Sequence, residues 1–120
     1  MAALRRHRPG LHTVAVEPAE SPILSEGRTG GHRIEGIGLG FVVPMWDPSD
    51  ASELATVSSD DAHAMARRLA REEALFGGAS SGGNVVVALR IAERLGPGHT
   101  VATIQVDSGL KYLSTEVYRS

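Results

Sequence analysis

The residues Asp107, Ser108 and Gly109 directly follow an apolar segment that runs from Val101 to Val106. This pattern predicts a buried strand that carries a hydroxyl and a glycine turn to its carboxyl end. In open α/β sheets the carboxyl ends of the strands form the ligand crevice. A hydroxyl held there can orient a bound ring or anion without changing its own charge. Ser108 is therefore a candidate binding residue.

A second candidate site is the glycine-rich segment 36–40, in which three glycines alternate with Ile37 and Leu39. Glycine at alternate positions lets a backbone pass very close to another group. Glu35 lies beside this segment and could act as a general base. A solvated loop carboxylate is the commoner explanation for such a residue.

The glycine-serine segment 77–84 could cradle an anion at a helix N-terminus. It lacks the Gly-Lys-Ser/Thr ending of a P-loop, because Val85 follows Asn84. Its spacing also departs from the dinucleotide-binding fingerprint. The commoner alternative is that Ser80 and Ser81 cap a buried helix while the glycines allow close packing.

Other catalytic chemistries find little support in the sequence. The five histidines have no metal-ligand spacing, and the chain contains no cysteine. No Gly-x-Ser-x-Gly elbow marks a serine nucleophile. Lys111 is the only lysine, and its polar neighbours do not form the apolar pocket that activates an imine-forming amine. We therefore predict no metal site.

Composition limits the class of protein. A chain of 120 residues suits one modest domain that buries roughly two-thirds of its unfolded surface. The net charge of −2 and the aromatic content of 4% give no reason to expect nucleic acid or a membrane surface as partner. The basic segment 1–10 is not followed by the apolar region of a signal peptide, and no run approaches a membrane span of about 20 residues. The absence of cysteine fits a cytoplasmic location.

Alternating strands and helices are predicted along the rest of the chain. We expect a helix end at residues 2–8, strands at 12–18, 55–57 and 101–106, a loop at 21–33, and helices at 58–76 and 85–95. This order predicts an α/β fold with a parallel sheet. The first helix is short and has no capping residue before it, so we expect the chain to begin in the middle of a helix.

Taken together, five segments resemble the cysteine synthase family, the O-acetylserine sulfhydrylases among the fold-type-II (tryptophan synthase β-like) pyridoxal-phosphate enzymes. Cystathionine β-synthases share several of them more loosely. The segments are 14–25 (VAVEPAESPILS), 31–44 (GHRIEGIGLGFVVP), 57–62 (VSSDDA), 78–84 (GASSGGN) and 107–115 (DSGLKYLST).

The resemblance implies a cofactor, pyridoxal 5'-phosphate, and roles for particular residues. The family's serine in the Asp-Ser-Gly motif binds the pyridine nitrogen of the cofactor, which implies this role for Ser108. A neutral hydroxyl leaves that nitrogen unprotonated and favours β-elimination. Gly36, Ile37 and Gly38 match the segment that lines the substrate side of the pocket. At position 83 the sequence has glycine where the family usually has alanine.

The resemblance also implies a partial domain. Residues 1–120 match the C-terminal part of the family's three-layer parallel-sheet domain, truncated at the N-terminus. The Schiff-base lysine, the Thr-Ser-Gly-Asn-Thr substrate-carboxylate loop and the Gly-Thr-Gly-Gly-Thr phosphate cradle would all precede Met1. We therefore expect no catalytic residue in this chain, and Lys111 should not be taken for the catalytic lysine.

The implied reaction is β-replacement, which turns O-acetylserine and sulfide into cysteine and acetate. We expect the chain alone to be inactive. The alternatives are a non-catalytic fragment or association module, or a piece of a cystathionine β-synthase-like enzyme. The expected partners are a small amino-acid substrate and either a second copy in a homodimer or a separate N-terminal fragment.

Overall fold

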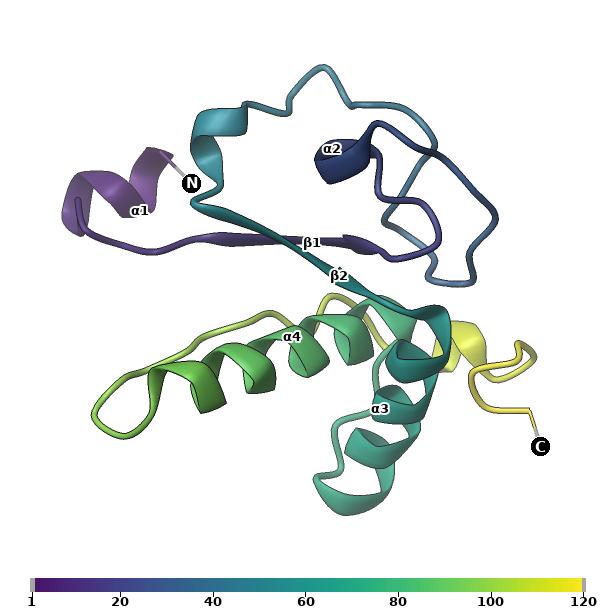
Figure 1. Ribbon diagram of the computed structural model, residues 1–120. Helices are drawn as coiled ribbons and strands as arrows, with labels where there is room; N and C mark the ends of the chain where they lie inside the picture. Colours follow the sequence, from purple (N-terminus) through teal and green to yellow (C-terminus); the bar gives the residue numbers. More distant parts are fainter. Residues whose placement is uncertain (1, 120) are drawn as a thin grey trace.

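The computed structural model describes residues 2–119, which form two small layers (Figure 1). The parallel strands lie in one layer, and the two long helices cover one face of them. The elements are α1 (Ala2–His7), β1 (Val14–Pro18), α2 (Ile23–Glu26), β2 (Glu53–Val57), α3 (Ser59–Glu72) and α4 (Ala79–Leu95), with single 3-10 turns at Pro48–Asp50 and Gly109–Tyr112.

The sheet confirms the predicted parallel pairing. β1 and β2 are hydrogen-bonded in parallel, with Val14 opposite Glu53 and Pro18 opposite Val57. The β-branched valines of β1 favour the extended backbone, and Pro18 is tolerated because it ends the strand. The predicted α/β fold is therefore correct, although both strands differ in length from the prediction.

Helix α3 begins at Ser59, one residue after the predicted start, and ends at Glu72, four residues before the predicted end at 76. Ser58 is the N-cap, and its hydroxyl accepts a hydrogen bond of 3.1 Å from the amide of Asp61. Acidic residues in the first turn also suit the positive end of the helix dipole. The buried face of the helix includes His63, whereas Met65 is only half-buried.

Helix α4 starts earlier than predicted, at Ala79 instead of Val85, so that most of the glycine-serine segment 77–84 forms its first turns. The N-cap is Gly78, which has no side chain to contribute, and the predicted capping by Ser80 and Ser81 is wrong. Ser81 instead accepts a hydrogen bond of 2.9 Å from the amide of Val106. The glycines let the start of α4 pack close against its neighbours, such as Ala62 of α3. Helix propensity alone would disfavour a helix that contains these glycines.

Two further expectations are corrected. Residues 101–106 form no strand, because no other strand within residues 2–119 pairs with them; the side chain of Asn84 instead donates to the carbonyl of Ile104 (3.2 Å). The predicted loop 21–33 contains α2. Its single turn is stabilised by Glu17, which accepts hydrogen bonds from the backbone amides of Leu24 (2.8 Å) and Ser25 (2.9 Å).

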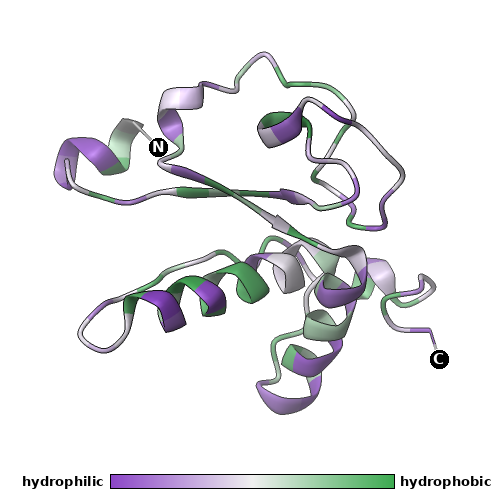
Figure 2. Cartoon of the chain, in the orientation of Figure 1, coloured by the Kyte–Doolittle hydropathy of each residue, from purple (hydrophilic) through white to green (hydrophobic). Residues whose placement is uncertain are grey.

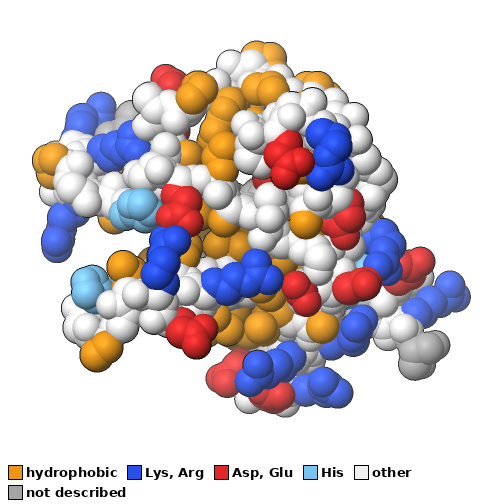
Figure 3. All heavy atoms as spheres, in the orientation of Figure 1, with side chains coloured by type: hydrophobic (Ala, Val, Ile, Leu, Met, Phe, Trp, Pro, Cys, Tyr) orange, Lys and Arg blue, Asp and Glu red, His pale blue; other side chains and the backbone are white. Residues whose placement is uncertain are grey.

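The hydrophobic core lies between the sheet and the helices (Figures 2 and 3). It also receives two residues from the C-terminal segment, so that this segment is anchored although it has no strand. None of the helices within the described part of the chain is long and apolar enough to cross a membrane. The buried apolar residues are Ile34, Val57, Ala62, Ala66, Ala79, Val87, Tyr112 and Val117.

Candidate binding site at Ser108

Ser108 lies on the surface between two anchored residues. It has an extended backbone (φ −92°, ψ 138°) and is the N-cap of the 3-10 turn that begins at Gly109. Its hydroxyl oxygen accepts a hydrogen bond of 3.3 Å from the amide of Leu110. Within residues 2–119 the hydroxyl proton is donated to no protein acceptor, so it is available to the lone pair of a ligand.

The residue before Ser108 is held by three groups. The carboxylate of Asp107 accepts a hydrogen bond of 2.5 Å from the Tyr112 hydroxyl and one of 3.3 Å from the Gly78 amide. The amine of Lys111 lies 3.5 Å from the same carboxylate. Asp107 therefore joins the Ser108 turn to the residue that caps α4.

Tyr112 completes this connection by packing. Its side chain is buried, and a Cβ atom at Gly78 would lie 2.4 Å from its ring. The hydrogen bond to Asp107, together with burial and the negative charges of Asp107 and Glu35, raises the pKa of Tyr112 to about 12. The hydroxyl is therefore neutral at physiological pH and acts as a donor.

The residue after Ser108 is fixed to the segment that precedes α4. The amide of Gly109 donates a hydrogen bond of 2.9 Å to the carbonyl of Phe76, and the side chain of Gln105 donates one of 3.1 Å to the same carbonyl. A Cβ atom at Gly109 would lie 2.4 Å from the Phe76 ring, so only glycine fits. The turn thus keeps its place without a strand behind it.

The glycine segment takes the unusual backbone that its sequence predicts. Gly36 has φ +90° and Gly38 has φ +62°, which are conformations that other residues rarely adopt. His32 closes this turn: its Nδ1 accepts from the amide of Ile34 (3.2 Å) and its Nε2 donates to the carbonyl of Gly38 (2.8 Å). These partners assign the neutral tautomer with the proton on Nε2.

The two predicted segments meet at a cavity of about 260 Å³, to which Glu35 and Tyr112 both contribute. None of the predicted residues Ser108, Gly36, Ile37 and Gly38 lines it; Ile37 packs against the core instead. The structure therefore brings together the neighbours of the predicted residues. The lining residues are His32, Arg33, Glu35, His63, Ala79, Tyr112, Thr115, Glu116 and Val117.

Sequence reasoning missed the roles of Asp107, Tyr112 and His32. Each acts through a hydrogen bond to a backbone or side-chain group whose position depends on the tertiary fold. The only sequence signal was that these residues lie within the two motifs. Among the described residues, no three histidine, cysteine or acidic side chains come together as metal ligands.

The observed donor set fits the cofactor implied by the sequence at one point. The hydroxyl of Ser108 can donate a hydrogen bond to an unprotonated pyridine nitrogen, and no charged side chain among residues 2–119 is hydrogen-bonded to it. Lys111 does not fit the role of an imine-forming amine. Its side chain is exposed, and its amine pairs with Asp107 and lies 5.7 Å from the centre of the Tyr112 ring.

Comparison with known proteins gives a consistent result. The family model described as pyridoxal-phosphate dependent enzyme matches residues 1–107. A cysteine synthase of Staphylococcus aureus is 38% identical over 115 residues, which is 96% of this chain and 37% of that protein. The chain therefore spans little more than a third of the length of this curated relative.

Solved structures show the same partial match. The O-acetylserine sulfhydrylase isoform 3 of Entamoeba histolytica aligns with a TM-score of 0.92 and 35% identity, covering 99% of this chain and 36% of that one. An O-acetylserine-dependent cystathionine β-synthase of Helicobacter pylori aligns with a TM-score of 0.90 and 37% identity, covering 98% and 38%.

Proposed function

Because this chain belongs to the family of pyridoxal-phosphate dependent enzymes, we propose that its residues form the C-terminal part of a cysteine synthase-like enzyme. The proposed reaction of the complete enzyme is β-replacement, in which O-acetylserine and sulfide give cysteine and acetate. The similarity to a cysteine synthase over 96% of this chain supports this reaction. A cytoplasmic location and a homodimer remain predictions.

The observation that carries the proposal is the available hydroxyl of Ser108. Pyridoxal phosphate, when bound, supplies the electron sink that β-replacement requires. In this proposal the Ser108 hydroxyl donates a hydrogen bond to the pyridine nitrogen and so would hold the ring without transferring its proton. The flanking anchors at Asp107 and Gly109 support this role because they keep the donor in place.

Gly36, Ile37 and Gly38 form the substrate side of the site in the same proposal. A Cβ atom at Gly36 would meet nothing within 4 Å, so this part of the backbone is open to a ligand. Gly38 is packed against Pro18 and His32, and Ile37 packs against the core. We therefore assign the contact to Gly36 and the support of the turn to its two neighbours.

A chimera tests the proposal directly. The 120 residues of this chain would replace the matching segment of the Staphylococcus aureus cysteine synthase, and cysteine formation from O-acetylserine and sulfide would be measured. The expected result is an active chimera in which Ser108→Ala weakens binding of pyridoxal phosphate about tenfold, as expected for one lost hydrogen bond.

Ser114→Ala is the matched control, because Ser114 is an exposed serine on the same segment. It should leave cofactor affinity unchanged. A folded chimera that binds the cofactor equally well with and without the Ser108 hydroxyl would contradict the assigned role.

A second candidate reaction is favoured by the Helicobacter pylori structure, whose protein is an O-acetylserine-dependent cystathionine β-synthase. The same chimera, supplied with homocysteine in place of sulfide, would then form cystathionine. Faster turnover with homocysteine than with sulfide would favour this alternative over cysteine synthesis.

A non-catalytic association module is the remaining alternative. Several apolar side chains of the segment after the glycine turn are exposed, including Phe41 at 58% and Met45 at 93%. Apolar surface of this kind favours association. Sedimentation of the 120-residue chain distinguishes the cases, because a monodisperse monomer would contradict an association role.

A further inference from the structure

We propose that Asp107 and Tyr112 are a pair of positioning residues that set the direction of the Ser108 hydroxyl. They do so by tying the Ser108 turn to Gly78, the residue that caps α4. This inference rests on the proposed role of Ser108 toward the pyridine nitrogen. Neither residue is proposed to touch the cofactor.

The contacts of Ser108 itself are too weak to fix its side chain. Within residues 2–119 the hydroxyl of Ser108 takes part in a single hydrogen bond, which it accepts from the Leu110 amide at 3.3 Å, and the residue is exposed. A serine side chain on a surface rotates freely unless its backbone and neighbours restrict it. The restriction must therefore come from the adjacent residues.

Asp107 supplies that restriction on one side of Ser108. Its side chain is 20% exposed, and its two carboxylate oxygens have separate partners. One accepts from the Tyr112 hydroxyl at 2.5 Å, and the other accepts from the Gly78 amide at 3.3 Å. Hydrogen bonds to a carboxylate are roughly twice as strong as neutral ones. This carboxylate therefore determines the backbone orientation at the start of the turn.

The bond between Tyr112 and Asp107 is separate from the contacts that dock the segment. Docking depends on Phe76, whose carbonyl accepts from Gly109 and Gln105. Loss of the Tyr112 hydroxyl leaves those bonds and the packing of the ring on Gly78 in place. A change confined to the Ser108 side chain would thus distinguish positioning from general support of the fold.

Substitutions of Asp107 offer a graded series. In Asp107→Asn the amide oxygen can accept from Gly78 while the amide nitrogen donates to the Tyr112 hydroxyl, so both contacts survive without charge. Asp107→Ala loses both. We expect the order of effects to be Asp107→Ala, then Tyr112→Phe, then Asp107→Asn.

The experiment uses two measurements. In the labelled 120-residue chain, the Hα–Hβ coupling constants of Ser108 report whether its side chain keeps one rotamer, and amide hydrogen exchange of Gly109 reports docking onto Phe76. In the chimera described above, a titration gives the dissociation constant for pyridoxal phosphate. Tyr118→Phe is the matched control, because it removes a tyrosine hydroxyl that donates to Gly77 at 2.5 Å and does not touch Asp107.

We expect Tyr112→Phe to average the Ser108 rotamers and to raise the dissociation constant severalfold, up to the value of about tenfold expected when Ser108→Ala removes the donor itself. Exchange at Gly109 should change less than about threefold, and Asp107→Asn should retain most of the affinity. Unchanged Ser108 couplings, or equal loosening at Ser108 and Gly109, would overturn the inference. If Ser108→Ala leaves cofactor affinity unchanged while Tyr112→Phe still averages the rotamers, the proposed function fails and the positioning does not.

Discussion

Gly82 of α4 lies directly against the backbone of Ala62 in α3: a Cβ atom at Gly82 would lie 2.1 Å from the carbonyl oxygen of Ala62. The amide nitrogen of Ala66 would be 2.8 Å away. Backbone atoms of a helix cannot move aside singly, so Gly82→Ala must separate the helices. We expect a loss of about 3 kcal/mol in the free energy of unfolding, at the upper end of overpacking effects, measured by urea denaturation.

Gly83 is the matched control for this contact. A Cβ atom there would lie 3.1 Å from Cγ1 of Val57, a tight contact that a shift of this methyl group by a few tenths of an ångström relieves, and 3.6 Å from Cβ of Ala62, an ordinary contact. Gly83→Ala also gains up to about 1 kcal/mol of helix propensity. We expect a net change within about 1 kcal/mol. An equal loss of stability at both glycines would contradict the packing argument.

The raised pKa of Tyr112 makes stability depend on alkaline pH. The pKa of the hydroxyl is 10.0 in the unfolded chain. In the folded chain the hydrogen bond to Asp107, together with burial, raises this pKa to about 12. The folded state holds the proton more tightly, so this contribution is complete below pH 10 and is lost as pH rises towards 12. Its size is on the order of 2 kcal/mol.

A Tyr118→Phe background makes this measurement specific, because the chain contains two tyrosines. Denaturation would be followed at several alkaline pH values, with tyrosinate absorbance reporting ionisation. Adding Tyr112→Phe should flatten the decline of stability between pH 10 and 12. A decline of the same slope without Tyr112 would show that other groups cause it.

These contacts show what the sequence can and cannot predict. The strands and α3 were predictable because their signals are local. β-branched residues, Pro18 and the Ser58 cap each determine the backbone conformation of residues close to them in the sequence. The prediction of a strand at 101–106 was wrong because a strand exists only with a partner strand, and apolar residues alone do not supply one. The segment is held instead by side chains such as Ser81.

The candidate site was predictable to a similar degree. Ser108 was singled out because it follows the apolar segment 101–106 and matches the Asp-Ser-Gly motif, and the glycines because they alternate along segment 36–40; their binding roles stay predictions. The hydrogen bonds of Asp107 to Gly78 and Tyr112 could not be found in this way, since they depend on where α4 begins. That helix begins at Ala79 because tertiary packing overrides the low helix propensity of its glycines.

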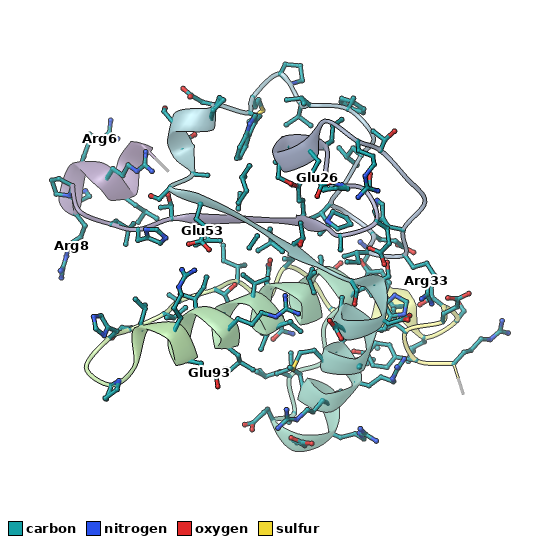
Figure 4. All side chains as sticks on the ribbon, viewed as in Figure 1. Arg6, Arg8, Glu26, Arg33, Glu53 and Glu93 are labelled. Atoms are coloured by element: carbon teal, nitrogen blue, oxygen red, sulfur yellow. The ribbon has the colours of Figure 1, made fainter. Side chains whose placement is uncertain are left out.

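An ion pair across the two layers gives an acid-dependent prediction. Glu53 of β2 points towards α4 (Figure 4), where its carboxylate lies 2.7 Å from the guanidinium of Arg94 and 3.1 Å from His12. Hydrogen bonds from Arg94, and then from His12, lower the pKa of Glu53 to about 2. Its contribution is therefore present above pH 4.5 and lost as pH falls towards 2.

The size of this contribution should be small. Arg94 is 54% exposed, and solvent screening limits such pairs to below about 1 kcal/mol. Glu53→Gln should flatten the loss of stability between pH 4.5 and 2 in denaturation experiments. Glu93→Gln is the control, since Glu93 lies next to Arg94 on α4 and is an exposed carboxylate with no ion pair among the described residues. An equal effect of both substitutions would rule out the pair as the cause.

The glycine segment allows stability and ligand contact to be separated. Gly38→Ala combines a left-handed backbone with contacts of 2.6 Å to Pro18 and 2.7 Å to His32, neither of which is free to move. Gly36→Ala and Gly40→Ala meet only the backbone strain, at φ +90° and +78°, because both positions open into free space. We expect the two open positions to lose about 1 kcal/mol each, and Gly38→Ala to lose more.

The effects on substrate should follow a different order. In the proposed function Gly36 faces the substrate, so a methyl group there occupies space that the ligand needs, whereas Gly40 lies beyond the contact. Gly36→Ala should therefore raise KM for O-acetylserine in the chimera well above the value for Gly40→Ala, although the two variants have equal stability. Equal KM values for this pair would mean that the open backbone at Gly36 is not where the substrate binds.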